Sequence, residues 1–233
     1  MRKTISAFFI TATGTSIGKT FVTAALCHQL SLVGRPVQAL KPVISGYKDI
    51  APGNTDSGVL LESMGMEPTK RNVVNISPWR FLAEISPDMA AARENRDINF
   101  SQLIGFCKES IENNTAQGIT TLIEGVGGVM VPLNATHTVL DWITVLKIPT
   151  ILVAGTYLGT ISHTLTAHSV LTSRGVNAID ILLSQSTKNP VPTKETASVI
   201  SKFLPDVRIT RVARVSDEPA PWKRCQNLLD ILE

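Results

Sequence analysis

Residues 8–22 read FFITATGTSIGKTFV, a stretch that changes character halfway along. An apolar run gives way to small and hydroxylated residues, and Gly18-Lys19-Thr20 then opens a segment with helical periodicity. This pattern predicts a buried strand, a phosphate-binding loop and a helix, because free backbone N–H groups at a helix N-terminus form a concave anion site. We expect Lys19 to reach the outer phosphates of a nucleotide and the Thr20 hydroxyl to hold Mg²⁺.

The loop departs from the commonest form of this motif, in which a glycine stands five residues before Gly18. That position is Thr13, and Ala12 stands where a longer variant of the loop would have its first glycine. Gly-Lys-Thr alone occurs by chance, so the prediction depends on its place between an apolar strand and a helix. The alternative is an ordinary strand-to-helix turn with a solvated Lys19.

The composition fits one α/β enzyme domain spanning residues 1–233. Hydrophobic residues make up 43% of the chain and charged residues 18%, which is ordinary for a globular protein. The net charge of +3 is too small and too scattered to predict nucleic-acid binding. Neither the cysteines nor the histidines show metal-ligand spacing, so the cysteines are interpreted as reduced thiols of a cytoplasmic protein.

The first residues, Met1-Arg2-Lys3 followed by ISAFFITA, resemble the start of a signal peptide. The apolar run is too short, and cleavage there would destroy the phosphate loop, so we expect no export. No stretch approaches the roughly 18 apolar residues that span a bilayer, so no membrane association is expected.

Strands and helices alternate along the chain. Further strands are expected at 35–40, 120–123, 149–154, 178–183 and 207–212. Helices are expected at 21–33, 89–93, 100–111, 139–145, from about 162 to 173, at 193–204 and at 222–232. Residues 64–100 otherwise look irregular. The alternation predicts a doubly wound, mostly parallel sheet with helices on both faces.

Charged residues follow two of the predicted strands. Lys41 comes directly after the second strand, and Glu124 ends the third before the glycine-rich run 125–128. Ligands of open α/β sheets bind at the carboxyl ends of strands, which makes Lys41 a candidate second cation. Glu124 is a candidate for Mg²⁺, which prefers oxygen ligands. The alternatives are a solvated lysine before a turn and a glycine-rich turn with a solvated glutamate.

Polar residues stand at the start of two predicted helices, and each set has two interpretations, as a helix cap or as part of a binding site. Asn54, Thr55 or Asp56 provides an N-cap, and the local sequence favours capping as the role of Asp56. Thr160 and Ser162 lie where helix N–H groups favour a carboxylate, or they only cap the helix.

Four segments taken in order, TATGTSIGKT, LKPVISG, NTD and IEGVGG, resemble the dethiobiotin synthetases. SPDMAA and YLGTISHT add to the resemblance, which covers about residues 6 to 215. It implies a fold of the P-loop NTPase type and an ATP- and Mg²⁺-dependent ligase of biotin synthesis. The implied substrates are 7,8-diaminononanoate, CO₂ and ATP, and the products are dethiobiotin, ADP and phosphate.

The resemblance also implies roles for single residues. Lys19 and Lys41 would be catalytic, and Ser45 would contact the diamine or its carbamate. The helix start at Gly159, Thr160 and Ser162 would receive the substrate carboxylate. Thr20, Asp56 and Glu124 would hold Mg²⁺, which reverses the local interpretation of Asp56. The implied ATP contacts are Thr15, Ser16, Ile17, Gly18, Lys19, Thr20, Phe21, Asp56, Glu124, Gly125, Val126, Gly127, Ser184 and Gln185. The family implies a homodimer with substrate near the subunit interface.

The chain departs from the family pattern at several positions. The family often has glycine at the position of Ala12 and an acidic residue at that of Ser16, where the change removes a charge near the amines. Its adenine-contacting asparagine falls at Ser184, next to Gln185, and a second base-lining segment falls near 213–215.

Two other classes compete with this interpretation. A nucleotide-switch ATPase of the partitioning type would carry a signature lysine at position 14, which is Gly14 here. The C-terminal segment from Trp222 resembles a membrane-targeting helix, but its few basic residues favour packing on the protein. An amidotransferase-type cobyrinate synthase would need a glutaminase domain, for which the chain is too short.

Overall fold

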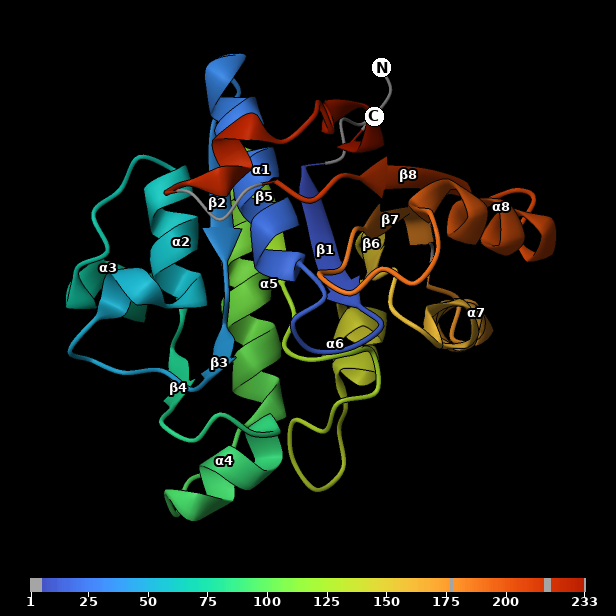
Figure 1. The fold of residues 1–233 in the computed structure, drawn as a ribbon. Coiled ribbons are helices and arrows are strands. Elements are labelled where there is room, and N and C mark those ends of the chain that lie inside the picture. Colours follow the sequence, from blue (N-terminus) through green and yellow to red (C-terminus); the bar gives the residue numbers. More distant parts are fainter. Residues whose placement is uncertain (1–5, 177, 216–218, 233) are drawn as a thin grey trace.

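A parallel sheet of six strands runs through the middle of the structure, a computed structural model that describes residues 6–176, 178–215 and 219–232 (Figure 1). Its strands, in sheet order, are β2 Val37–Leu40, β5 Thr120–Glu124, β1 Ala7–Ala12, β6 Thr150–Ala154, β7 Ala178–Ser184 and β8 Arg208–Val212. Every neighbouring pair is parallel. The predicted doubly wound sheet is therefore confirmed.

Helices cover both faces of the sheet. They are α1 Lys19–Leu32, α2 Asp56–Ser63, α3 Lys70–Ile76, α4 Pro87–Arg93, α5 Phe100–Ala116, α6 Val139–Leu146, α7 Thr160–Ser173 and α8 Thr193–Phe203. Figure 1 shows α1 and α5 on opposite faces of the sheet. This placement follows from right-handed crossovers, because the connection from β1 to β2 and the connection from β2 back to β5 run in opposite directions across the sheet. Because every neighbouring pair of strands is parallel, all carboxyl ends of the strands lie at one edge of the sheet.

The central strands are buried because both of their faces are covered. Every residue of β1 is buried, as are all residues of β5 and β6. Phe9 in β1 packs edge to face against Trp142 of α6, with ring centroids 4.9 Å apart. This packing fixes β1, and with it the loop that follows.

The stretch predicted as irregular, residues 64–100, contains more structure than expected. It includes α3 and β4, which spans Trp79–Phe81 and pairs in parallel with β3 at Val43–Ser45. The strands are only three residues long, too short to give a periodic signal in the sequence. Helix α5 also continues past the expected stop at Asn113-Asn114, because the Asn114 side chain is buried and donates to Thr121 and Gln38.

The predicted C-terminal helix at 222–232 is wrong. This segment forms two short 3₁₀ helices, η2 at Pro221–Arg224 and η3 at Leu229–Leu232. Between them the backbone bonds to Gln29 of α1: the Gln29 amide donates to the carbonyl of Gln226 at 2.8 Å and accepts from the N–H of Leu228 at 2.8 Å. Trp222 and Ile231 are buried, which agrees with packing on the protein. In the described ranges, no helix has the length and apolar character needed to cross a bilayer.

An ion pair lies on the outer strands. Asp180 of β7 is fully buried and accepts from Nε of Arg208 on β8 at 2.6 Å, while its second oxygen, Oδ1, lacks a hydrogen-bond partner among the described residues. Burial raises the pKa of Asp180 above its ordinary value of 3.8, and this effect outweighs the opposing influence of Arg208.

We expect the stability that Asp180 contributes to increase as the pH falls. As the pH falls, the folded state binds a proton at Asp180 before the unfolded state does, because the pKa is higher in the folded state. The free energy of unfolding therefore increases as the pH falls through the raised pKa and decreases as the pH rises through it. Urea unfolding of wild type and Asp180→Asn at a series of pH values from 7 down toward the ordinary pKa of 3.8 measures the effect. The advantage of wild type over the variant should grow as the pH falls, and Asp206→Asn at an exposed turn should show no such trend. An advantage that grows toward pH 7 would contradict the expectation.

Candidate active site

The loop between β1 and α1 has the conformation of an anion-binding loop. Gly18 caps α1 with φ +106°, in the left-handed region that favours glycine. A Cβ atom at Gly18 would lie 2.8 Å from Oγ of Ser184, so this position also lacks room for a side chain. Ser16 has a positive φ of 56° without being glycine. The N–H groups that open α1 are therefore presented next to the carboxyl end of β7.

Lys19 links this loop to the glycine-rich run after β5. Its Nζ donates to the carbonyl oxygens of Gly14 at 3.1 Å and Gly127 at 2.7 Å. Burial and the nearby Lys41 lower the pKa of Lys19 to about 8. Within the described residues, the ammonium group is thus held at the floor of the loop by hydrogen bonds to neutral carbonyl oxygens.

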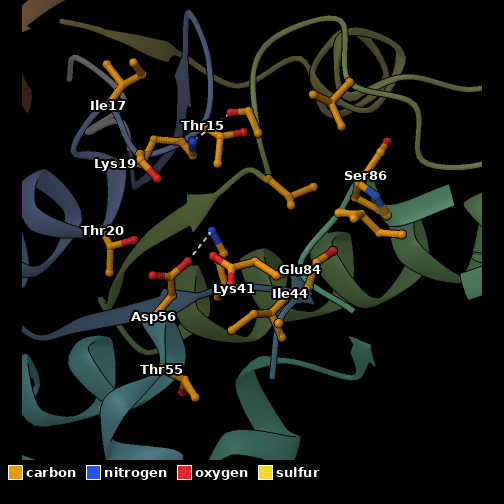
Figure 2. A pocket seen from close by; sticks show the side chains of 18 of the residues that line it. Thr15, Ile17, Lys19, Thr20, Lys41, Ile44, Thr55, Asp56, Glu84 and Ser86 are labelled. Atoms are coloured by element: carbon orange, nitrogen blue, oxygen red, sulfur yellow. Dashed lines mark hydrogen bonds and ion pairs between the residues drawn. The ribbon is translucent and has the colours of Figure 1, made fainter. Parts of the chain in front are cut away.

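Lys41 is buried between two carboxylates. Its Nζ lies 2.6 Å from Oε1 of Glu124 and 3.2 Å from Oδ2 of Asp56, and it also donates to the carbonyl of Gly125 at 2.9 Å. Figure 2 shows the ion pair with Asp56. Burial alone would lower the pKa of Lys41, but the two carboxylates outweigh it and the net shift is upward. Asp56 shows the mirror effect: burial opposes ionisation, yet Lys41 holds the pKa of Asp56 below its ordinary value. The three groups form one charged cluster.

The N-cap of α2 is Thr55, not Asp56. The Thr55 hydroxyl accepts from the N–H of Gly58 at 3.1 Å, and Asp56 is the first helical residue. The local interpretation of Asp56 as a cap is therefore wrong. Its carboxylate points at Lys41 instead, as Figure 2 shows.

A cavity of about 700 Å³ opens between the phosphate loop and the β3–β4 pair. The predicted site residues that line it are Thr15, Ser16, Ile17, Gly18, Lys19, Thr20, Lys41, Ser45, Asp56, Val126 and Gly127. The far wall, which the sequence analysis did not assign, consists of Ile44, Gly46, Glu84, Ile85, Ser86, Pro87 and Val131. Two segments of the resemblance were signals for this wall, since LKPVISG includes Ile44 and Gly46 and SPDMAA includes Ser86 and Pro87.

Other predicted residues lie behind or beside this cavity. Glu124 is fully buried behind Thr20 and Lys41. Gly125 does not line the cavity, and its carbonyl accepts a hydrogen bond from Lys41. Phe21 packs against the core instead of lining the cavity. Ser184 touches the loop next to Gly18, and its neighbour Gln185 accepts from the N–H of Arg214 at 3.3 Å.

The predicted carboxylate-binding residues do not line the phosphate-loop cavity. Gly159, Thr160 and Ser162 instead line a second, more apolar cavity of about 670 Å³, with Leu158 and Phe203 on its walls. Thr160 is buried and donates its hydroxyl proton to the carbonyl of Gly155 at 2.7 Å. Within one chain, the two parts of the expected substrate site are therefore separate.

The described residues fit a magnesium ion held mainly by a nucleotide. Among them, His, Cys, Asp and Glu form no group of three or more that could hold a metal by itself. Glu124 Oε2, however, is buried without a hydrogen-bond partner in the described chain, and Oε1 accepts from the Thr20 hydroxyl at 2.8 Å. Mg²⁺ commonly binds through one or two carboxylates plus phosphates and water, which matches this donor set.

Comparisons with known proteins agree with this geometry. A sequence profile described as an AAA domain matches residues 6–220. The ATP-dependent dethiobiotin synthetase BioD of Acidiphilium cryptum is 46% identical over 201 residues, which cover 86% of this chain and 89% of that protein. The protein of the same name from Methylobacterium nodulans is 42% identical over 219 residues, covering 93% and 96%.

A solved structure, the MinC:MinD cell division protein complex of Aquifex aeolicus, aligns with a TM-score of 0.52 at 13% identity and covers 97% of this chain and 84% of that one. This likeness shows the P-loop NTPase fold alone. The sequence relatives are far more specific, because their identity extends over most of both chains. The chain belongs to the family of ATP-dependent dethiobiotin synthetases.

Proposed function

We propose that this protein converts 7,8-diaminononanoate, CO₂ and ATP to dethiobiotin, ADP and phosphate. The observation that carries the proposal is the charged floor of the cavity, where Lys19 at the start of α1 and Lys41 directly after β2 converge on the space beside the phosphate loop. Phosphoryl transfer depends mainly on positioning and on stabilising charge, which is what two fixed ammonium groups supply.

The reaction proceeds in three steps. One amine adds to CO₂, forming a C–N bond and releasing a proton to give a carbamate. A carbamate oxygen then attacks the γ-phosphorus of ATP, and ADP leaves to give a carbamic–phosphoric mixed anhydride. The second amine attacks the carbonyl carbon, closing the cyclic urea as phosphate and a proton leave. Lys41 would stabilise the carbamate and the transferred phosphoryl group, and Lys19 the β- and γ-phosphates.

Thr20, Asp56 and Glu124 would hold the Mg²⁺ that accompanies ATP. Such an ion neutralises charge on the phosphate oxygens. Lys41 is paired with the same two carboxylate groups, Asp56 and Glu124, so the ammonium group and a divalent ion would lie side by side in this site. Ser184 and Gln185 would lie toward the nucleotide base, since Ser184 touches the loop at Gly18.

We further propose a cytoplasmic homodimer in which α7 of the partner completes the substrate site. The separation of Gly159 and Thr160 from the phosphate-loop cavity supports this proposal, because a second subunit could bring a helix N-terminus to the substrate carboxylate.

Asp56→Asn is expected to raise the Mg²⁺ concentration needed for half-maximal activity about 10-fold, because a neutral amide is a weaker ligand for a hard cation than a carboxylate. Titration of activity with Mg²⁺ at saturating ATP measures this. Asp49→Asn removes the same charge from an exposed pair with Lys70 outside the cavity and should leave the requirement unchanged. An unchanged requirement in Asp56→Asn would remove this residue from the metal site.

The product identifies the reaction. With ¹³C-bicarbonate as the source of CO₂, mass spectrometry should show a cyclic urea one mass unit heavier than the unlabelled product. A heavier product cannot arise from a nucleotide-switch ATPase, which is the alternative class. Gly14 at the position of that class's signature lysine also favours the synthetase.

A further inference from the structure

Glu84 stands on the far wall of the phosphate-loop cavity, away from the nucleotide side. In Figure 2 it lies near Ile44, across the cavity from Ile17 and Lys19. The residue is exposed, and its carboxylate makes no ion pair or hydrogen bond within the described part of the chain.

The backbone beneath Glu84 is held firmly. The β3–β4 pair continues past its strands, with the N–H of Gly46 donating to the carbonyl of Ala83 at 3.1 Å. Gly46 has φ +76°, and a Cβ atom there would lie 3.1 Å from Cγ of Glu84. A glycine at position 46 thus leaves room for the stem of Glu84 against this wall.

The charges around the cavity leave one carboxylate without a partner. The charged side chains that line it are Lys19, Lys41, Asp56 and Glu84. Asp56 is paired with Lys41, as is the buried Glu124 behind it. Glu84 alone among these lining carboxylates lacks a cation, so a cation entering from solvent meets an unneutralised acceptor on this wall.

We propose that Glu84 binds an ammonium group of the diamine substrate and so distinguishes the two neighbouring amines. This inference rests on the proposed function. The amine that adds to CO₂ must be uncharged, and it faces Lys41 and Lys19, where the carboxylates of Asp56 and Glu124 are already paired with Lys41 and leave no free acceptor for an ammonium. The other amine, on the adjacent carbon, faces Glu84 as an ammonium. Glu84 is thus a substrate-binding residue that sets the orientation of the diamine.

Steady-state kinetics of Glu84→Gln tests the proposal. The KM for 7,8-diaminononanoate should rise about 10-fold, as expected when a charge-assisted hydrogen bond is lost. The KM for ATP and the Mg²⁺ requirement should stay within about 2-fold. Glu109→Gln, which removes the same charge from an exposed site on α5 outside the cavity, should behave as wild type.

A second readout uses 7-aminononanoate and 8-aminononanoate, each of which lacks one amine, as competitive inhibitors. Wild type should bind the diamine more tightly than either analogue, and Glu84→Gln should lose most of the difference for one of them, the analogue that lacks the amine facing Glu84. An unchanged KM for the diamine, or a change confined to ATP or Mg²⁺, would overturn the role of Glu84 while leaving the proposed function intact. A wild-type protein that makes no cyclic urea would overturn the proposed function itself.

Discussion

Lys41→Met is expected to reduce turnover at least about 100-fold, the usual cost of removing one preorganised group that stabilises transition-state charge. The ammonium lies at the cavity floor, 2.6 Å from Glu124 and 3.2 Å from Asp56. Because Lys41 is buried, the variant also leaves Glu124 without its cation, which costs about 3–5 kcal/mol of folding stability. Turnover is therefore to be measured together with urea unfolding, at a temperature where the variant is folded.

Two further variants separate charge from position. Lys41→Arg keeps the positive charge and should retain more stability than Lys41→Met, yet stay slow because a planar guanidinium does not replace a point charge. Lys70→Met removes an exposed lysine paired with Asp49 and should change neither property. A folded Lys41→Met variant with turnover within about 3-fold of wild type would exclude Lys41 from catalysis.

Gly58→Ala is expected to lower both stability and activity, although alanine is the better helix former. A Cβ atom at Gly58 would lie 2.2 Å from the carbonyl oxygen of Pro52 and 2.6 Å from Cα of Gly53. Backbone cannot move aside as a side-chain end can, so α2 and the 3₁₀ helix η1 at Pro52–Asn54 must separate. We expect a loss of roughly 2–3 kcal/mol by urea unfolding. The Mg²⁺ concentration needed for half-maximal activity should rise, because Asp56 is displaced from the metal site.

Gly105→Ala is the matched control for this prediction. Gly105 also lies within a helix, α5, and nothing lies within 4 Å of an added Cβ atom. The substitution should raise stability by up to about 1 kcal/mol. A stabilised Gly58→Ala variant would show that the close contact between α2 and η1 is absent in solution.

Sequence reasoning predicted the sheet and the cluster around the phosphate loop because both depend on strong local patterns. An apolar β1 followed by Gly18-Lys19-Thr20 leaves little choice of fold, and parallel strands bring Lys41 and Glu124 to the same edge. The helix at Asp56 shows the limit of local reasoning: a cap and an ion-pair partner of Lys41 look alike until a distant strand is placed beside them.

The far wall of the cavity could not be derived in the same way. Glu84 follows a three-residue strand, and its place depends on the pairing of β4 with β3, which no periodicity predicts. The C-terminal segment failed for a similar reason. Its apolar residues fit a helix, but side-chain hydrogen bonds from Gln29 compete for the backbone at 226–228.

Phosphate release from ATP, Mg²⁺ and bicarbonate, measured with and without 7,8-diaminononanoate, tests the central claim most directly. We expect release only when the diamine is present, with one phosphate formed for each cyclic urea. Release that does not depend on the diamine, or no release in either case, would contradict the synthetase activity proposed for this chain.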